Sequence, residues 1–499
     1  MREKEARPVE AAETFLYVLR NPLMRIIFKL ANTRCPKNKQ PLIEYALDDC
    51  ICEKRNTCIS CEWFSRIVSL AIRNGEAAFG IKRDSLEKII RNVYYRRGLV
   101  SVLEGIARLG VAIPFIPISP FLVVWNYTNA CNLRCIHCYQ RADRPLPDEL
   151  STEEKKAVID ELSEAGVVSI AFSGGEPLMA KDFLEIARYA TDRDIHVAVA
   201  TNGTLITNEM ARKLKESGVQ YAEVSLDGAT SQTHNSFRGT PDAFEKTIRG
   251  VENLLHENIF TCIAATATKH TLHEIPQIIE LSKELGVKRV LVFNFIPTGR
   301  GEGIVDMDLT PVEREDLLNH LYDELATGEL EALCTAPQYS RVCFQRSMQK
   351  GRDLVTPTHF YAGEFHGRTR SLAEFIGGCG AGRLYCAIQP NGLVTPCVFM
   401  PIVVGDLRRE SFKDVWLNSK VLHDLRDRRR LKGRCRHCEF RHVCGGCRAR
   451  AYTYYDDYLA PDPGCIRELE EPSISFAKGS MVKRLPFSIS SNRELVVEA

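Results

Sequence analysis

Cys-Asn-Leu-Arg-Cys-Ile-His-Cys-Tyr, residues 131–139, places the three cysteines Cys131, Cys135 and Cys138 in one short loop. It follows an apolar run, residues 121–125, that indicates a buried strand. A [4Fe–4S] cluster has four irons, and a purely structural cluster normally takes four cysteine ligands. Three thiolates would leave one iron open to an external ligand, as an open position does at a catalytic metal. A zinc site and plain reduced thiols are the alternative interpretations.

Apolar runs and amphipathic stretches alternate around this loop. The apolar runs predict strands at residues 121–126, 167–173, 195–200, 219–226, 258–266 and 288–296. The amphipathic stretches predict helices between them at residues 152–165, 181–192, 207–217, 241–257 and 271–286. Strands that alternate with helices indicate an α/β fold with a parallel sheet. In such folds the reactive groups gather at the carboxyl ends of the strands.

Short polar motifs follow the predicted strands. After the second strand comes the run Gly174-Gly175-Glu176-Pro177. Glycines at such a place let the backbone approach a ligand closely. Asn202 ends the third strand and Ser225 the fourth, both in tight-turn sequences, and Arg238 lies further on. Taken alone, the first motif could be an ordinary turn and Arg238 a solvated surface side chain.

These motifs, in this order, resemble those of the radical S-adenosylmethionine (SAM) superfamily. The resemblance implies a partial (β/α)6 barrel over residues 119–305. It also implies that the open iron holds the amino and carboxylate groups of SAM. One electron then cleaves SAM to methionine and a 5′-deoxyadenosyl radical, which abstracts hydrogen from the substrate. The implied SAM contacts are Tyr139 beside the adenine, the Gly-Gly-Glu-Pro motif at the amino group, and Asn202, Ser225 and Arg238 around the ribose and carboxylate.

A second cysteine-rich segment covers residues 379–465. Its eight spaced cysteines are Cys379, Cys386, Cys397, Cys435, Cys438, Cys444, Cys447 and Cys465. A zinc ribbon is the alternative, but its cysteine pairs are usually separated by about 12–20 residues. Only five residues lie between Cys438 and Cys444, which is too few for that arrangement. Eight thiolates suit two four-thiolate [4Fe–4S] clusters.

This segment resembles the SPASM domain of radical SAM maturases. The resemblance implies a first auxiliary cluster on Cys379, Cys386, Cys397 and Cys447, and a second on Cys435, Cys438, Cys444 and Cys465. Many relatives have three residues between the last paired cysteines, whereas only Gly445 and Gly446 lie between Cys444 and Cys447 here. The assignment of that pair is therefore open. The Cys-Gly-Gly-Cys-Arg-Ala-Arg-Ala variant (444–451) resembles members from haem-type cofactor pathways and metallocofactor maturation.

Residues 1–118 form an amino-terminal extension of helical, basic and apolar pattern. Residues 15–31 mix Arg20, Arg25 and Lys29 with bulky apolar side chains, the composition of an interfacial amphipathic helix. An ordinary core helix is the alternative. Cys50, Cys52, Cys58 and Cys61, with Cys35 nearby, offer thiolates for zinc or for a further iron–sulfur cluster. Scattered reduced thiols are the alternative there.

The amino-acid composition further narrows the classes of protein to which this chain can belong. The chain has 499 residues, 44% of them hydrophobic, and a formal net charge of +2, which argues against a protein dominated by nucleic-acid binding. We expect no secretory signal and no transmembrane helix, hence a cytoplasmic protein that associates at most peripherally with a membrane. Nineteen cysteines in metal-cluster spacings indicate a reducing, anaerobic cell. A connecting region (306–378) with a helix at 310–326 and a tail (466–499) complete the predicted organisation.

The sequence thus predicts a radical SAM/SPASM oxidoreductase with three [4Fe–4S] clusters. Our first expectation for the substrate is a long apolar molecule such as an archaeal isoprenoid ether lipid, because of the basic and apolar extension. A peptide and a tetrapyrrole or metallocofactor precursor are the alternatives, and a zinc-ribbon binding scaffold is the non-enzymatic one. The basic run 426–434 is either a solvated face or a docking surface for a ferredoxin or flavodoxin. No residue stands out as a catalytic acid or base.

Overall fold

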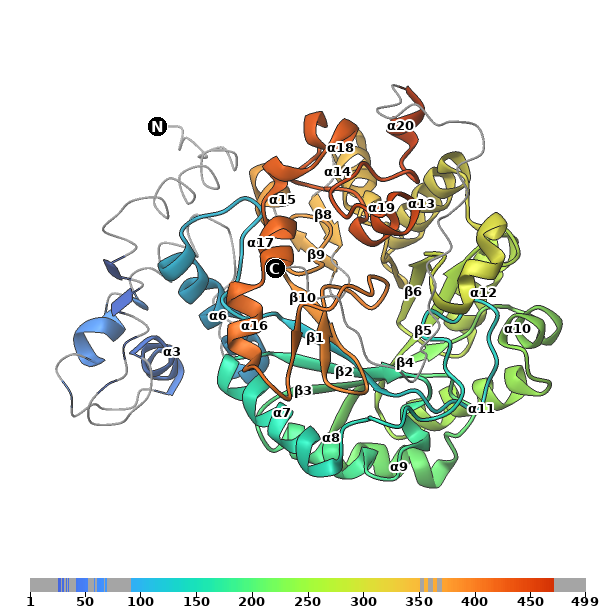
Figure 1. Ribbon diagram of the computed structural model, residues 1–499, viewed down its shortest axis with the longest axis horizontal. Coiled ribbons are helices and arrows are strands. Elements are labelled where there is room, and N and C mark those ends of the chain that lie inside the picture. The colour runs from blue at the N-terminus through green and yellow to red at the C-terminus, as the bar shows by residue number, and fades with distance from the viewer. Residues whose placement is uncertain are drawn as a thin grey trace, which may run out of the picture.

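The structure, a computed structural model, describes residues 26, 27, 29, 30, 33, 35, 42–52, 58, 61–66, 68, 69, 91–350, 354–357, 362–365 and 370–470. Six parallel strands form its centre (Figure 1). They are β1 (Leu122–Thr128), β2 (Ser169–Gly174), β3 (His196–Thr201), β4 (Val219–Ser225), β5 (Phe260–Ala267) and β6 (Arg289–Asn294). Each overlaps its predicted range, so the α/β fold with a parallel sheet is confirmed.

Helices surround these strands on the outside (Figure 1). They are α7 (Thr152–Ala165), α8 (Phe183–Thr191), α9 (Asn208–Glu216), α10 (Ser231–Arg238), α11 (Ala243–His256), α12 (Ile275–Glu284) and α13 (Pro311–Leu325), with the short turns η1 (Pro177–Met179), η2 (Leu272–Glu274) and η3 (Gly299–Met307). Local chemistry fixes their ends: Ser151 and Glu154 form a capping box at the start of α7, and Gly166 closes it in the left-handed conformation. Among α7 to α13, only α10 was not predicted from the sequence.

Strands from distant segments extend the sheet at both edges. β7 (Glu331–Cys334) pairs in parallel with β6, and β10 (Tyr385–Ile388) pairs in parallel with β1. β11 (Leu393–Thr395) and β12 (Gly405–Asp406) follow β10 in antiparallel pairing. The sheet has ten strands in the order β12-β11-β10-β1-β2-β3-β4-β5-β6-β7, and its two ends do not pair, so the barrel is open. The cysteine-rich carboxyl-terminal segment therefore shares the sheet of the cysteine loop.

The remaining elements, orange to red in Figure 1, lie across the top and the left side of that view. They are α14 (Gln338–Lys350), the hairpin β8 (Leu354–Pro357) and β9 (Ala362–Phe365), α15 (Arg370–Ile376), α16 (Phe412–Asn418), α17 (Lys420–Arg426), η4 (Arg428–Arg430), α18 (Gly433–His437), α19 (Arg448–Tyr455) and α20 (Ile466–Glu470). The main core consists of the inward faces of the central strands and the helices that cover them.

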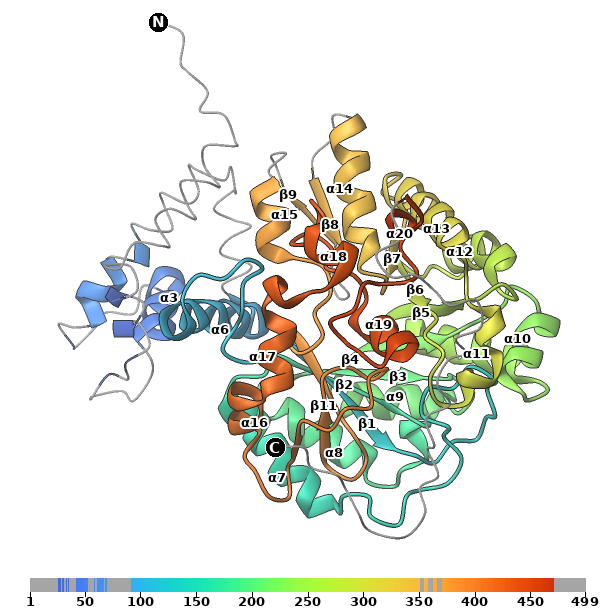
Figure 2. The same ribbon diagram turned by 45° about the horizontal axis from the view of Figure 1, so that its top comes forward.

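Two helices of the amino-terminal region, α3 (Leu42–Cys52) and α6 (Val93–Leu109), lie side by side (Figures 1 and 2). α6 is fastened to the barrel by Arg97, whose guanidinium donates to the carbonyls of Ser163, Arg193 and Asp194 at 2.8–2.9 Å. These carbonyls lie just before the amino ends of β2 and β3, so α6 sits at the end of the barrel opposite the cysteine loop.

The predicted interfacial helix at residues 15–31 falls mostly outside the described residues. Within it, the side chains of Ile26 and Leu30 are exposed, whereas Ile27 packs against a small core beside α3. No helix in the part of the chain that the structure describes combines the length and hydrophobicity needed to cross a membrane. Binding to a membrane surface stays a prediction.

Candidate active site

A cavity of about 1010 Å³ runs through the inside of the strand layer. At the carboxyl ends of the strands its wall contains Cys131, Cys135 and Cys138. At the opposite end its wall contains side chains of α6, among them Tyr94 and Leu99. The cavity therefore connects the cysteine loop with the amino-terminal extension.

Contacts from distant segments hold the cysteine loop in place. The backbone N–H of Ile136 donates to the Phe237 carbonyl at 3.1 Å. Arg300 donates from its backbone to the Cys138 carbonyl at 2.8 Å and from its guanidinium to the Cys135 carbonyl at 2.7 Å. Because the loop carbonyls are engaged in this way, the tertiary structure fixes the loop and leaves the three thiols on the cavity wall.

The charges around the thiols suit an iron–sulfur cluster. Burial raises the pKa of the Cys131 thiol to about 12, so its thiolate requires positive charge nearby. The Arg238 guanidinium lies 3.7 Å from Cys135 Sγ and pairs with Asp227 at 2.5 Å. Burial opposes the charge of Arg238, but Asp227 and Cys135 outweigh it and raise the pKa of Arg238. Arg238 is buried, so its interpretation as a solvated surface residue is wrong.

The Gly174-Gly175-Glu176-Pro177 turn packs against the start of the cysteine loop. Gly174 has a φ of 110°, a conformation that favours glycine. A Cβ at Gly175 would lie 2.0 Å from the Ala130 carbonyl oxygen, which accepts a hydrogen bond of 2.7 Å from the backbone N–H of Glu176. Glycine is therefore required because the backbone near Ala130 packs closely against this turn. The sequence analysis had instead explained the glycines by the close approach of a ligand.

Glu176 joins this turn to the one after β3. Its buried carboxylate accepts hydrogen bonds from Thr201 Oγ1 at 2.9 Å and from the backbone N–H of Asn202 at 2.8 Å. Burial raises the pKa of Glu176 to about 7, against the effect of these hydrogen bonds. Gly174 and Gly175 line the cavity, whereas Glu176 and Pro177 lie behind its wall. Glu176 therefore acts by holding the two turns together.

Three further predicted SAM contacts, Tyr139, Asn202 and Ser225, line the same cavity. Tyr139 Oη donates to Asn126 Oδ1 at 3.0 Å, and Asn202 Nδ2 donates to Asn132 Oδ1 at 2.8 Å. These hydrogen bonds orient both side chains at the carboxyl ends of the strands. The structure brings the predicted residues together, and their contacts with SAM stay predictions.

Glu223 is a cavity residue that the sequence reasoning missed. Its side chain lines the cavity from β4, two positions before Ser225. Desolvation raises the pKa of Glu223 to about 7, although Arg289 acts in the opposite direction. Residues two apart on a strand share a face, so the predicted position of Ser225 could have identified Glu223 as well. A carboxyl group with this pKa can both accept and release a proton near neutral pH.

Three cysteines of the first auxiliary set, Cys379, Cys397 and Cys447, line a small hollow of about 60 Å³ next to the main cavity. Tyr385 lies among them and donates from Oη to Cys397 Sγ at 2.9 Å. Tyr385 also lines the main cavity, so it separates this set from the site of the cysteine loop. The three thiols could hold one auxiliary cluster beside the cavity.

Cys386, the predicted fourth ligand, lies elsewhere. It follows Tyr385 on β10, and successive side chains of a strand point to opposite faces of the sheet. Its fully buried side chain belongs to the main hydrophobic core, and the charge that affects its pKa is that of Arg426. The assignment of Cys386 to the first set is corrected on this ground.

We expect Cys386→Ala to keep the iron content of the wild-type protein, because the side chain packs in the core. Cys397→Ala, its matched partner, should lose about four irons per chain, the content of one cluster. Anaerobic iron and sulfide analysis of the two variants measures the difference. An equal loss of iron in both variants would restore Cys386 as a ligand.

The cysteines of the second auxiliary set lie near one another, and their ligation of a cluster stays a prediction. Burial raises the pKa of Cys444, and the neighbouring Cys465 and Cys435 raise it further. Cys438 acts on Cys435 in the same way. Buried thiols this close favour ionisation only with a metal, so their chemistry fits a cluster. Cys444 lies near Cys435 and Cys465, whereas Cys447 lines the hollow with Cys379 and Cys397, and the two ligand sets stay predictions.

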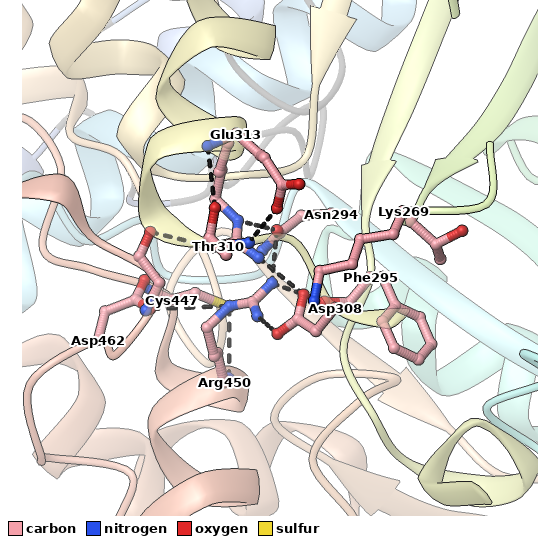
Figure 3. A network of polar contacts seen from close by, with 12 residues as sticks. Lys269, Asn294, Phe295, Asp308, Thr310, Glu313, Cys447, Arg450 and Asp462 are labelled. Atoms are coloured by element: carbon pink, nitrogen blue, oxygen red, sulfur yellow. Dashed lines mark hydrogen bonds and ion pairs between the residues drawn. The ribbon is translucent and has the colours of Figure 1, made fainter. Parts of the chain in front are cut away.

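A buried polar network ties this region to the barrel (Figure 3). Arg450 of α19 pairs with Asp308 and donates to Asn294 Oδ1 and to the Phe295 carbonyl, each at 2.6 Å. The backbone N–H of Cys447, at the start of the same helix, donates to Asp462 at 2.6 Å. Asn294 ends β6 and lines both cavities, so the network couples the first auxiliary set to the site in the barrel.

The basic run at residues 426–434 is only partly a surface. Arg426 and Arg428 are buried and donate to backbone carbonyls, among them that of Cys379 at 2.9 Å. Arg429 and Lys432 are exposed and pair with Asp427 and Asp457, respectively. The buried part of the run therefore stabilises the backbone around the auxiliary cysteines. The docking of a ferredoxin or flavodoxin on its exposed part stays a prediction.

The predicted amino-terminal metal ligands are described in part. Cys58 and Cys61 lie within the described residues, and the side chains of Cys50 and Cys52 lie outside them. The structure brings Cys58 and Cys61 together with Cys35, a partner that the sequence spacing did not predict.

Comparisons with known proteins agree with this geometry. The family model of the Radical SAM superfamily matches residues 125–282, and that of the SPASM iron–sulfur cluster-binding domain matches residues 379–439. The AdoMet-dependent heme synthase of Methanosarcina barkeri is 39% identical over 350 residues, 70% of this chain and 97% of that relative. The Fe-coproporphyrin III synthase of the same organism is 32% identical over 70% of this chain and 88% of that relative.

Among solved structures, Streptococcus suis SuiB bound to S-adenosylmethionine shares the fold, with a TM-score of 0.60, 18% identity, and coverage of 82% of this chain and 90% of SuiB. The family settles the broad class, because it comprises enzymes that use SAM and iron–sulfur clusters, and a non-enzymatic zinc-ribbon scaffold is thereby excluded. The chain belongs to the radical SAM superfamily and is a radical SAM enzyme with a carboxyl-terminal SPASM domain.

Proposed function

We propose that this radical SAM/SPASM enzyme modifies an iron porphyrin or a closely related tetrapyrrole. The observation that carries the proposal is the similarity to an AdoMet-dependent heme synthase over nearly the whole of that relative. The name of a second relative, the Fe-coproporphyrin III synthase, also refers to an iron-containing tetrapyrrole. Neither name refers to a lipid, and the peptide alternative is not contradicted. The lipid, our first expectation from the sequence, therefore gains no support, and the tetrapyrrole alternative takes its place.

The cavity supports this choice by its size and lining. Ligand pockets commonly measure about 300–1,000 Å³, so a cavity of about 1010 Å³ has room for SAM and a second molecule. Apolar side chains such as Val124, Val199 and Phe293 supply much of its wall and suit a flat apolar macrocycle. Arg289 lines the wall as well and brings positive charge to it, which suits the carboxylates of a porphyrin.

We assign a separate role in the proposed reaction to each group of cavity residues. Cys131, Cys135 and Cys138 would hold the cluster, and Arg238 offsets its negative charge. When bound, SAM and the reduced cluster supply a 5′-deoxyadenosyl radical that removes a hydrogen atom from the substrate. Glu223 is our candidate for the group that moves a proton in the same cavity. The thiols of Cys379, Cys397 and Cys447 border the cavity, where a cluster could accept an electron.

The proposal is tested by adding iron coproporphyrin III to the reduced holoenzyme with SAM in the absence of oxygen. The expected result is 5′-deoxyadenosine in amounts that match the porphyrin consumed, with a porphyrin product of altered mass. The measurement is liquid chromatography with mass spectrometry, and the iron-free porphyrin is the matched control. If SAM is cleaved while the iron porphyrin is neither bound nor changed, the tetrapyrrole assignment is wrong.

Glu223→Gln tests the proton-transfer role separately. The substitution keeps the size of the side chain and removes its titration, so porphyrin turnover should fall roughly 100-fold or more, the usual contribution of an acid–base group. The wild-type rate should also change with pH near pH 7, where the carboxyl titrates, and this inflection should vanish in the variant. SAM cleavage without substrate should persist. An unchanged pH profile in the variant would remove Glu223 from the reaction.

A further inference from the structure

Three cysteines of the amino-terminal extension form a compact group away from the site described above. Cys35 and Cys61 are buried, at 1% and 0% exposure, and Cys58 is half-buried. Their three Sγ atoms lie within 4.8 Å of one another, and Cys35 Sγ lies 3.7 Å from Cys58 Sγ. Within the described residues, no other three possible metal ligands lie this close together. It lies before residue 125 and therefore outside both matched family ranges.

We propose that Cys35, Cys58 and Cys61 supply three of the four ligands of a structural zinc ion. The distances between the sulfur atoms fit such an ion. Zinc binds thiolates tetrahedrally at about 2.3 Å, which places the sulfur atoms about 3.8 Å apart. The observed 3.7 Å between Cys35 Sγ and Cys58 Sγ is close to that spacing. It is far longer than the bond of about 2.05 Å in a disulfide.

The same distances argue against an iron–sulfur cluster at this place. In a [4Fe–4S] cluster each cysteine binds a different iron of the cube, so the cysteine sulfurs lie farther apart than around one ion. Cys131, Cys135 and Cys138 give an internal comparison, because their sulfurs do not all lie within 4.8 Å of one another. The two groups of cysteines therefore differ in spacing in the way that a cluster site and a mononuclear site differ.

The surroundings explain what such an ion would do. The described apolar cluster beside this group is small, with five buried residues, Ile43, Ala46, Leu47, Phe64 and Val68. Small units of this kind usually depend on a metal or disulfide for stability. The core packs against Val100 and Leu103 of α6. Since α6 also forms one end wall of the large cavity, the zinc ion would hold that wall in position.

Metal analysis of the full-length holoenzyme, purified without oxygen in the presence of zinc, tests the proposal. We expect about one zinc per chain in addition to the cluster iron. The variant with Ser at Cys35, Cys58 and Cys61 should lose that zinc and keep the iron. Cys262→Ser is the matched control, because Cys262 is a buried cysteine of β5 distant from the group, and it should retain the zinc.

Zinc K-edge X-ray absorption of the wild-type protein gives a second measurement that does not depend on the folding of a variant. Sulfur neighbours at about 2.3 Å are expected. Nitrogen and oxygen neighbours alone, or wild-type protein without zinc, would overturn the proposal. A triple variant that keeps its zinc would do the same, and one that loses about four irons would assign the cysteines to a cluster.

Discussion

Replacing Cys131, Cys135 and Cys138 together with Ala abolishes the formation of 5′-deoxyadenosine. The three thiols line the cavity at the carboxyl ends of the strands, beside the buried Arg238, and the chain belongs to a superfamily that cleaves SAM on a cluster bound there. The expected loss is complete, because the superfamily binds and reduces SAM at the cluster of this loop. Anaerobic incubation with SAM and a strong reductant, followed by chromatography, measures it.

Iron content separates this effect from general damage. The triple variant should lose about four irons per chain and keep those of the auxiliary clusters, since each [4Fe–4S] cluster contains four. The cysteines at residues 379–465 lie outside the cysteine loop and are held by their own contacts. Continued SAM cleavage by the triple variant would show that the cluster loop has been misassigned.

Arg450→Ala lowers the free energy of unfolding by about 3 kcal/mol, within the range for breaking a buried ion pair. The guanidinium is almost fully buried, at 1% exposure, and its removal leaves Asp308 and the acceptors at Asn294 and Phe295 short of a donor (Figure 3). The variant should also lose auxiliary iron readily, because Arg450 lies in the helix that Cys447 begins. Denaturant unfolding under anaerobic conditions measures the change.

Arg429→Ala is the matched control, because Arg429 belongs to the nearby basic run and is 84% exposed. Its ion pair with Asp427 is a surface pair, so its loss should cost at most about 1 kcal/mol. If both variants unfold at the same denaturant concentration as the wild-type protein, the buried network does not hold the SPASM region to the barrel.

The regular part of the fold could be predicted from the sequence. The alternation of apolar runs with amphipathic stretches located β1 to β6 and, apart from α10, the α-helices between them, because each element buries one face and this leaves a local pattern. The cysteine loop and the Gly-Gly-Glu-Pro turn were placed correctly at the ends of β1 and β2 for the same reason. Ser225 could also have led to Glu223, its neighbour on the same strand face.

The tertiary structure decided which distant residues meet. Nothing local shows that β10 pairs with β1, or that this pairing turns Tyr385 toward Cys397 and buries Cys386 in the core. Spacing along the chain also did not single out Cys35 as a neighbour of Cys58 and Cys61, since Cys35 reaches them only through the packing of the extension. The sequence by itself determined the elements and the ligand chemistry, because both depend on residue type and short-range order. The ligand sets and the walls of the cavity depend on contacts between segments far apart in the chain, and only folding specifies these.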